Sequence, residues 1–67
     1  MNKVKNIVEC GIFQGWSRDN IIIQIMFEIA NKEEIELLCC WCDIPELTDK
    51  AEALYNKYRE EYYNSLK

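Results

Sequence analysis

Residues 35–44 have the sequence Ile-Glu-Leu-Leu-Cys-Cys-Trp-Cys-Asp-Ile, and this stretch constrains the fold more than any other. On a helix, where successive residues are about 100° apart, its apolar side chains fall on two faces. One face holds Ile35, Leu38, Cys39 and Cys42, and the opposite face holds Leu37, Trp41 and Ile44, with Cys40 at its edge. Helices that are apolar all round are normally buried. The stretch should therefore lie at the centre of a small bundle or present its second face to another chain.

The composition predicts a small helical domain. The chain has 67 residues, of which 49% are hydrophobic and 30% charged, with two Gly and one Pro. So few turn formers argue against many short strands and favour a few helices with short connections. A chain of this size buries only about 60% of its unfolded surface, so a partner or a second copy would matter for stability. We expect a single all-α domain over residues 1–67.

Start and stop signals predict a compact bundle of three to four helices, over about 3–13, 18–30, 32–43 and 46–65. Gly15 is free to take the left-handed conformation that ends helices, and Ser17 is a good N-cap. Asn31, followed three residues later by Glu34, has the form of a capping box and predicts a break there. One continuous helix through residue 31 is the alternative. Pro45 should end the third helix, because it cannot continue the hydrogen-bonding pattern.

Two apolar stripes define the predicted core. Between residues 21 and 30 the only polar side chains are Gln24 and Glu28, so the second helix is expected to be buried on most of its circumference. The fourth helix has an ordinary apolar stripe with charged residues elsewhere. The predicted centre of the bundle consists of Ile25, Ile29, Leu38, Cys42, Leu54 and Tyr58.

The net charge of −4 limits the classes of partner. It disfavours direct binding to nucleic acid or to an anionic membrane, where attraction to phosphate supplies much of the affinity. It is compatible with docking on a basic protein surface. The sequence shows neither a secretory signal nor the run of about 18 apolar residues that crosses a bilayer, so a cytoplasmic location is expected.

The residues that usually carry catalysis are missing. The chain has no His and no Gly-rich loop, so no base is present to activate a hydroxyl; we expect no enzymatic activity and no cofactor. The four cysteines, Cys10, Cys39, Cys40 and Cys42, do not have zinc-finger spacing. They are expected to be free thiols that pack as small hydrophobes, with a thiolate metal site as an alternative.

Partner binding is the function that the sequence favours. The apolar residues Leu37, Trp41 and Ile44 are predicted anchors, and Trp is strongly enriched at binding hot spots. Around them, residues 33–49 contain no basic residue and six acidic ones, Glu33, Glu34, Glu36, Asp43, Glu46 and Asp49. Such a rim of carboxylates would steer the patch toward a basic surface of the kind that a nucleic-acid-binding enzyme presents. Tyr63 is expected to be an exposed contact residue.

These features predict a small acidic interaction module that occupies a partner's surface sterically. Blockers of host nucleic-acid-handling or defence machinery, of the kind that phages and mobile elements encode, would have these properties. The alternative is a homodimeric regulator in which the second face of the third helix forms the dimer seam. Its layout resembles a helix-turn-helix, but the would-be recognition helix has no Lys or Arg after Lys32, so DNA phosphates would repel it.

Overall fold

The computed structural model describes residues 2–66, which form four helices and no strand. The helices are α1 (Lys3–Gln14), α2 (Arg18–Ile29), α3 (Lys32–Cys39) and α4 (Pro45–Ser65). The predicted all-α bundle is confirmed, and so is the break between the second and third helices. The third helix is shorter than predicted, because it ends at Cys39 and not at residue 43. None of these helices is both long enough and apolar enough to cross a membrane.

Local side-chain caps explain where the first three helices begin. Asn2, Ser17 and Asn31 are the N-caps of α1, α2 and α3, and each accepts a hydrogen bond from the backbone N–H three residues later. At Asn31 the capping box is complete, because the Asn31 N–H also donates to Glu34 Oε1 at 3.0 Å. Such caps satisfy backbone donors that a helix start leaves free. Helix α4 has no side-chain cap and begins with Pro45, which needs no N–H partner there.

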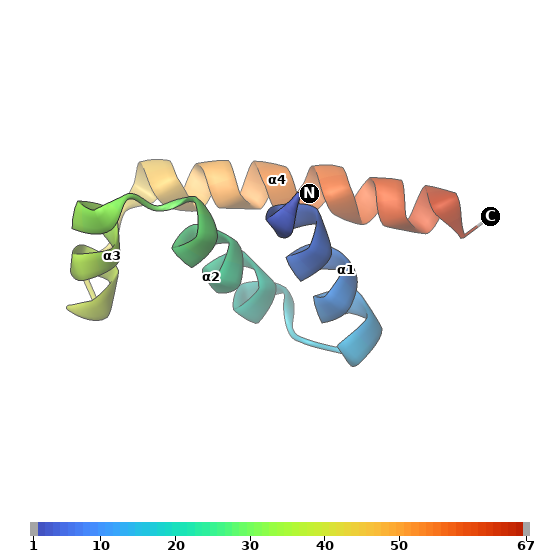
Figure 1. Ribbon diagram of the computed structural model, residues 1–67, viewed down its shortest axis with the longest axis horizontal. Helices are drawn as coiled ribbons and strands as arrows, with labels where there is room; N and C mark the ends of the chain where they lie inside the picture. The colour runs from blue at the N-terminus through green and yellow to red at the C-terminus, as the bar shows by residue number, and fades with distance from the viewer. Residues whose placement is uncertain (1, 67) are drawn as a thin grey trace.

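The core lies where α1, α2 and α4 meet. Helix α4 runs along one side of the molecule, and α1 and α2 pack against it and against each other (Figure 1). The buried hydrophobic residues are Val8, Ile21, Ile22, Ile25, Met26, Leu47, Ala51 and Tyr55. Gly11 allows α1 to approach α2 closely, since a Cβ at this position would lie 2.5 Å from Ile21 Cγ1.

Helix α3 lies outside this core, at the end of the molecule where α4 begins (Figure 1). None of its residues is buried. The predicted core position of Cys42 is therefore wrong: its side chain is exposed, because the helix stops before reaching it. Of the other predicted core residues, Ile25 is fully buried, and Ile29, Leu38, Leu54 and Tyr58 are partly buried against the core.

Helix α2 is also less enclosed than its sequence predicts. Ile23 is 49% exposed and Phe27 is 40% exposed, although both lie in the stretch 21–30, where the only polar side chains are Gln24 and Glu28. The reason is that α1 and α4 cover only part of its circumference, and α3 does not close the remaining side.

Candidate functional site

The end of α3 places Trp41 in a left-handed backbone conformation. Its φ is 63°, and Trp41 is the one non-glycine residue with positive φ among residues 2–66. The Trp41 N–H donates to the Leu38 carbonyl at 3.1 Å, and the Cys42 N–H donates to the Leu37 carbonyl at 3.0 Å. This pair of bonds is a Schellman motif, in which Gly normally occupies the left-handed position. A bulky side chain there is strained.

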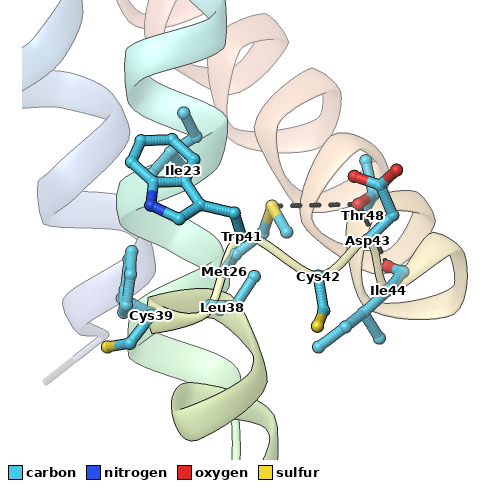
Figure 2. A pocket seen from close by; sticks show the side chains of 10 residues that line it. Ile23, Met26, Leu38, Cys39, Trp41, Cys42, Asp43, Ile44 and Thr48 are labelled. Carbon is cyan, nitrogen blue, oxygen red and sulfur yellow. Dashed lines mark hydrogen bonds between the residues drawn. The ribbon is translucent and has the colours of Figure 1, made fainter.

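This helix ending turns the Trp41 side chain out into solvent. The indole is 94% exposed, the largest value among the exposed large hydrophobic residues. The predicted grouping of Trp41 with Leu37 assumed a helix that continues to residue 44. The left-handed conformation of Trp41 breaks that helical register. Trp41 therefore lies on the side of its segment that faces α2 (Figure 2).

An apolar groove of about 450 Å³ lies between α2 and the segment that follows α3. From α2, the lining includes Ile23, Met26 and Phe27. From the segment after α3 it includes Trp41, Asp43 and Ile44 (Figure 2). We call this feature the Trp41 groove. Its volume falls within the range of roughly 300–1,000 Å³ that is usual for ligand-binding pockets.

The base of the Trp41 groove is fixed more firmly than its walls. Met26 belongs to the core and is 8% exposed. The Thr48 hydroxyl, from the second turn of α4, donates to the Ile44 carbonyl at 3.1 Å and lies 3.9 Å from the Met26 sulfur (Figure 2). These contacts join α2 to the start of α4 beneath the groove. The base of the groove therefore belongs to the packed core, and the exposed apolar side chains of Ile23, Phe27 and Trp41 lie around it.

The acidic residues of segment 33–49 form no ion pair within residues 2–66. Asp43 lines the groove itself, and Glu33, Glu36, Glu46 and Asp49 are all exposed on α3 and at the start of α4. The ion pairs within residues 2–66 join Lys3 to Glu28 and Arg18 to Asp19 and Glu52, so none involves the acidic residues of 33–49.

The structure separates Glu34 from the other five acidic residues in this segment. Its backbone N–H donates to Asn31 Oδ1 at 2.8 Å, and its carboxylate accepts the Asn31 N–H. Glu34 also lines a different surface hollow, with Ile29 and Leu47. Its local role is to hold the start of α3.

Two further predicted contact residues lie outside the Trp41 groove. Leu37 is 47% exposed but does not line it. Tyr63 is near the other end of α4, where its ring packs edge-on against Tyr62 at 5.6 Å and lies under the Arg59 guanidinium at 5.0 Å. Of the predicted apolar anchors, the structure therefore brings together Trp41 and Ile44.

Sequence reasoning missed the α2 wall. Ile23 and Phe27 are four residues apart and so lie on one face of the helix, one turn from each other. The one signal in the sequence was the amount of apolar surface on α2, which is more than one small core can cover. Which side would stay uncovered depends on how α1 and α4 pack, and no local pattern encodes that.

The cysteines do not pack in the interior as small hydrophobes, as the sequence predicted. Cys10, Cys39, Cys40 and Cys42 are all free and exposed. Cys39 and Cys42 line the Trp41 groove, and their sulfur atoms point apart (Figure 2). Within residues 2–66, no group of three or more cysteine or carboxylate side chains is arranged to hold a metal ion.

Comparison of the chain with protein-family models, with curated proteins and with solved structures finds no match.

Proposed function

We propose that this protein is a small interaction module whose Trp41 groove binds a basic surface of another protein and blocks that surface sterically. The observation that carries the proposal is the state of Trp41, which is 94% exposed and has a φ of 63°. Both properties disfavour Trp at this position if the residue serves only the fold.

The free energies involved support a functional role for Trp41. Full burial of a large apolar side chain stabilises a protein by about 1.5–3 kcal/mol, and Trp41 forgoes nearly all of that. A non-glycine residue in the left-handed region adds a cost on the order of 1 kcal/mol. Strained residues that the surrounding structure holds in place cluster at functional sites. A rigid indole held out beside an apolar groove is suited to anchor a partner.

The surrounding charge supports a basic partner. Residues 33–49 carry six carboxylates and no Lys or Arg, and the five outside the capping box are exposed. Complementary potentials accelerate encounter and suppress partners of the wrong sign. Nucleic-acid-handling enzymes present such basic surfaces, so we propose inhibition of an enzyme of this class, with the carboxylates taking the place of phosphates. The module contributes no chemistry of its own.

The homodimer alternative is weaker on the same grounds. A two-fold dimer across the Trp41 groove would bring Asp43 and the neighbouring carboxylates of both copies together. Like charges in such an interface cost free energy unless cations separate them. The acidic rim therefore favours a different, basic chain over a second copy.

The test compares two exposed aromatic residues. Tagged wild-type protein, Trp41→Ala and Phe13→Ala are used to capture partners from a cell lysate, and captured proteins are identified by mass spectrometry. Phe13 is 80% exposed near the end of α1 and does not line the groove, so Phe13→Ala is the matched control. Circular dichroism establishes that each variant is folded.

We expect one basic protein to be captured by wild type and by Phe13→Ala, and to be lost with Trp41→Ala. Its capture should weaken as salt is raised, because salt screens the exposed carboxylates. This protein should compete with a DNA duplex for the basic surface of the purified partner. Capture that is unaffected by Trp41→Ala, or reduced equally by both substitutions, would overturn the proposal.

A further inference from the structure

The shape of the Trp41 groove narrows the kind of structure that it accepts; this step depends on the function proposed above. Along its α2 wall, Ile23 and Phe27 lie one helical turn apart, with Met26 between them at the base. Side chains at this spacing form a ridge inclined to the helix axis, and the ridges of a second helix pack into the grooves beside it. The other lining side chains come from the end of α3, the turn after it and the start of α4.

The described residues offer no sheet edge to an extended peptide. Residues 2–66 contain no strand, so they present no sheet edge to which a strand could be added. The carbonyls of Leu37 and Leu38 already accept hydrogen bonds from Cys42 and Trp41. A helix needs no sheet edge, because it satisfies its backbone groups internally.

The distribution of charge indicates which residues should flank the apolar side chains of a docked segment. Asp43 lies in the groove wall, with Glu36 on α3 and Glu46 on α4 to either side of it along the chain. These carboxylates have no cationic partner among residues 2–66. Lys or Arg next to the apolar row of a docked segment would supply one.

We infer that the Trp41 groove binds an amphipathic α-helix of the partner protein, with a row of large apolar side chains against Phe27 and Trp41 and with Lys or Arg on its flanks. The apolar row spans positions i, i+4 and i+7, the usual anchors of helix-in-groove recognition. The Met26 side chain at the base adapts to different apolar residues, since Met is unbranched and flexible.

The probe is a fluorescein-labelled synthetic peptide of about 16 residues, long enough to be partly helical. It carries Leu at i, i+4 and i+7 and Lys and Ala elsewhere. A second peptide has the same composition in an order that spreads Leu around the helix. A third replaces every Lys by Glu. Binding to the full chain is followed by fluorescence anisotropy, and the site is mapped from backbone amide shifts in NMR spectra.

We expect the amphipathic basic peptide to bind about tenfold or more tightly than either control peptide, the difference that a hot spot supplies. Amide shifts should centre on Ile23, Phe27 and Asp43. Trp41→Gly should weaken binding about tenfold, and Phe13→Ala should leave it unchanged. Equal binding of the reordered peptide, or shifts centred near Phe13 or Tyr63, would overturn the inference.

The result also separates the two proposals. If no helical peptide binds but capture of a partner still depends on Trp41, the helix inference is wrong and the proposed function stands. If capture does not depend on Trp41, the proposed function is wrong, whatever the peptides do. Light scattering over a range of protein concentrations completes the test, because self-association that Trp41→Gly abolishes would identify a second copy as the occupant and overturn the inference.

Discussion

Gly15 and Trp41 occupy equivalent positions in two helix endings with the same hydrogen bonds. After α1, the Gly15 N–H donates to the Ile12 carbonyl at 3.2 Å and the Trp16 N–H donates to the Gly11 carbonyl at 2.8 Å. After α3, Trp41 and Cys42 donate in the same pattern. The left-handed residue has a φ of 78° at Gly15 and 63° at Trp41. One ending has the residue that this geometry favours, and the other has a bulky aromatic.

This equivalence predicts opposite effects of two substitutions on stability. Trp41→Gly should stabilise α3 against local opening by about 1 kcal/mol, because Gly takes the left-handed conformation without strain. Gly15→Ala, between two helices of the core, should lower the global free energy of unfolding by a similar amount, although open space surrounds the new Cβ. For a chain of this size, the Gly15→Ala change corresponds to a fall of about 4–8 °C in Tm.

Amide hydrogen exchange within α3 measures the first effect, and thermal unfolding followed by circular dichroism measures the second. Trp41→Ala is the control, since Ala keeps the positive φ unfavourable and should leave Tm close to that of wild type. A fall in Tm for Trp41→Gly would mean that the indole stabilises the fold. The interpretation of its exposure as a sign of partner binding would then be wrong.

Gly11 gives a second prediction, in which packing opposes helix propensity. Gly11→Ala should gain up to about 1 kcal/mol as a helix former. However, its Cβ would lie 2.5 Å and 2.8 Å from two carbon atoms of Ile21, which is 1% exposed and has little room to move. Overpacking of this kind costs about 1–3 kcal/mol, so the net effect should be destabilising.

Urea unfolding of Gly11→Ala and of Cys10→Ala measures the difference. Cys10 is the exposed neighbour on α1, and its substitution should change stability by less than about 0.5 kcal/mol. A Gly11→Ala variant more stable than wild type would show that α1 and α2 can separate slightly at no cost.

The location of α3 outside the core gives a third prediction. Ser17→Ala and Asn31→Ala each remove an N-cap, at a cost of about 1 kcal/mol. Because α2 is part of the core, Ser17→Ala should lower the global Tm. Asn31→Ala should instead speed amide hydrogen exchange within α3 with little change in Tm, because α3 buries no residue and opens locally. Equal losses of Tm would contradict a separately opening α3.

The helix starts were predictable because their signals are local. Ser17 and Asn31 precede their helices directly, and each satisfies a backbone donor of its own first turn. The end of α3 was not predictable in this way, because the left-handed residue there is Trp41, whereas the known signal is Gly or Asn. The change of direction at Trp41 also moves Cys42 off the predicted helix face.

The candidate site was only partly encoded in local patterns. The acidic residues and Trp41 could be identified from composition and residue type. The α2 wall could not, because Ile22 and Ile23 are consecutive residues of the same type, and no cap or turn signal indicates that Ile22 is buried and Ile23 exposed. That distinction arises from the packing of α1 and α4 on the other faces of α2.

The acidic rim provides the last prediction, which separates local charge from net charge. Glu36→Lys with Asp49→Lys, and Glu60→Lys with Glu61→Lys, each reverse two exposed carboxylates and so change the net charge from −4 to 0. The first pair lies on α3 and in the first half of α4, whereas the second lies toward the other end of α4. Since none of the four residues forms an ion pair within residues 2–66, both double variants should keep Tm nearly unchanged.

Stopped-flow fluorescence with the basic peptide, in a Trp16→Phe background that leaves Trp41 as the reporter, should distinguish the two double variants. Reversal at positions 36 and 49 should slow association about tenfold at low salt and remove most of its salt dependence, because attraction acts over about a Debye length. Reversal at positions 60 and 61 should have a much smaller effect, since those charges lie far from the groove. Equal slowing in both variants would mean that net charge alone steers the encounter, and the rim around the Trp41 groove would then have no specific role.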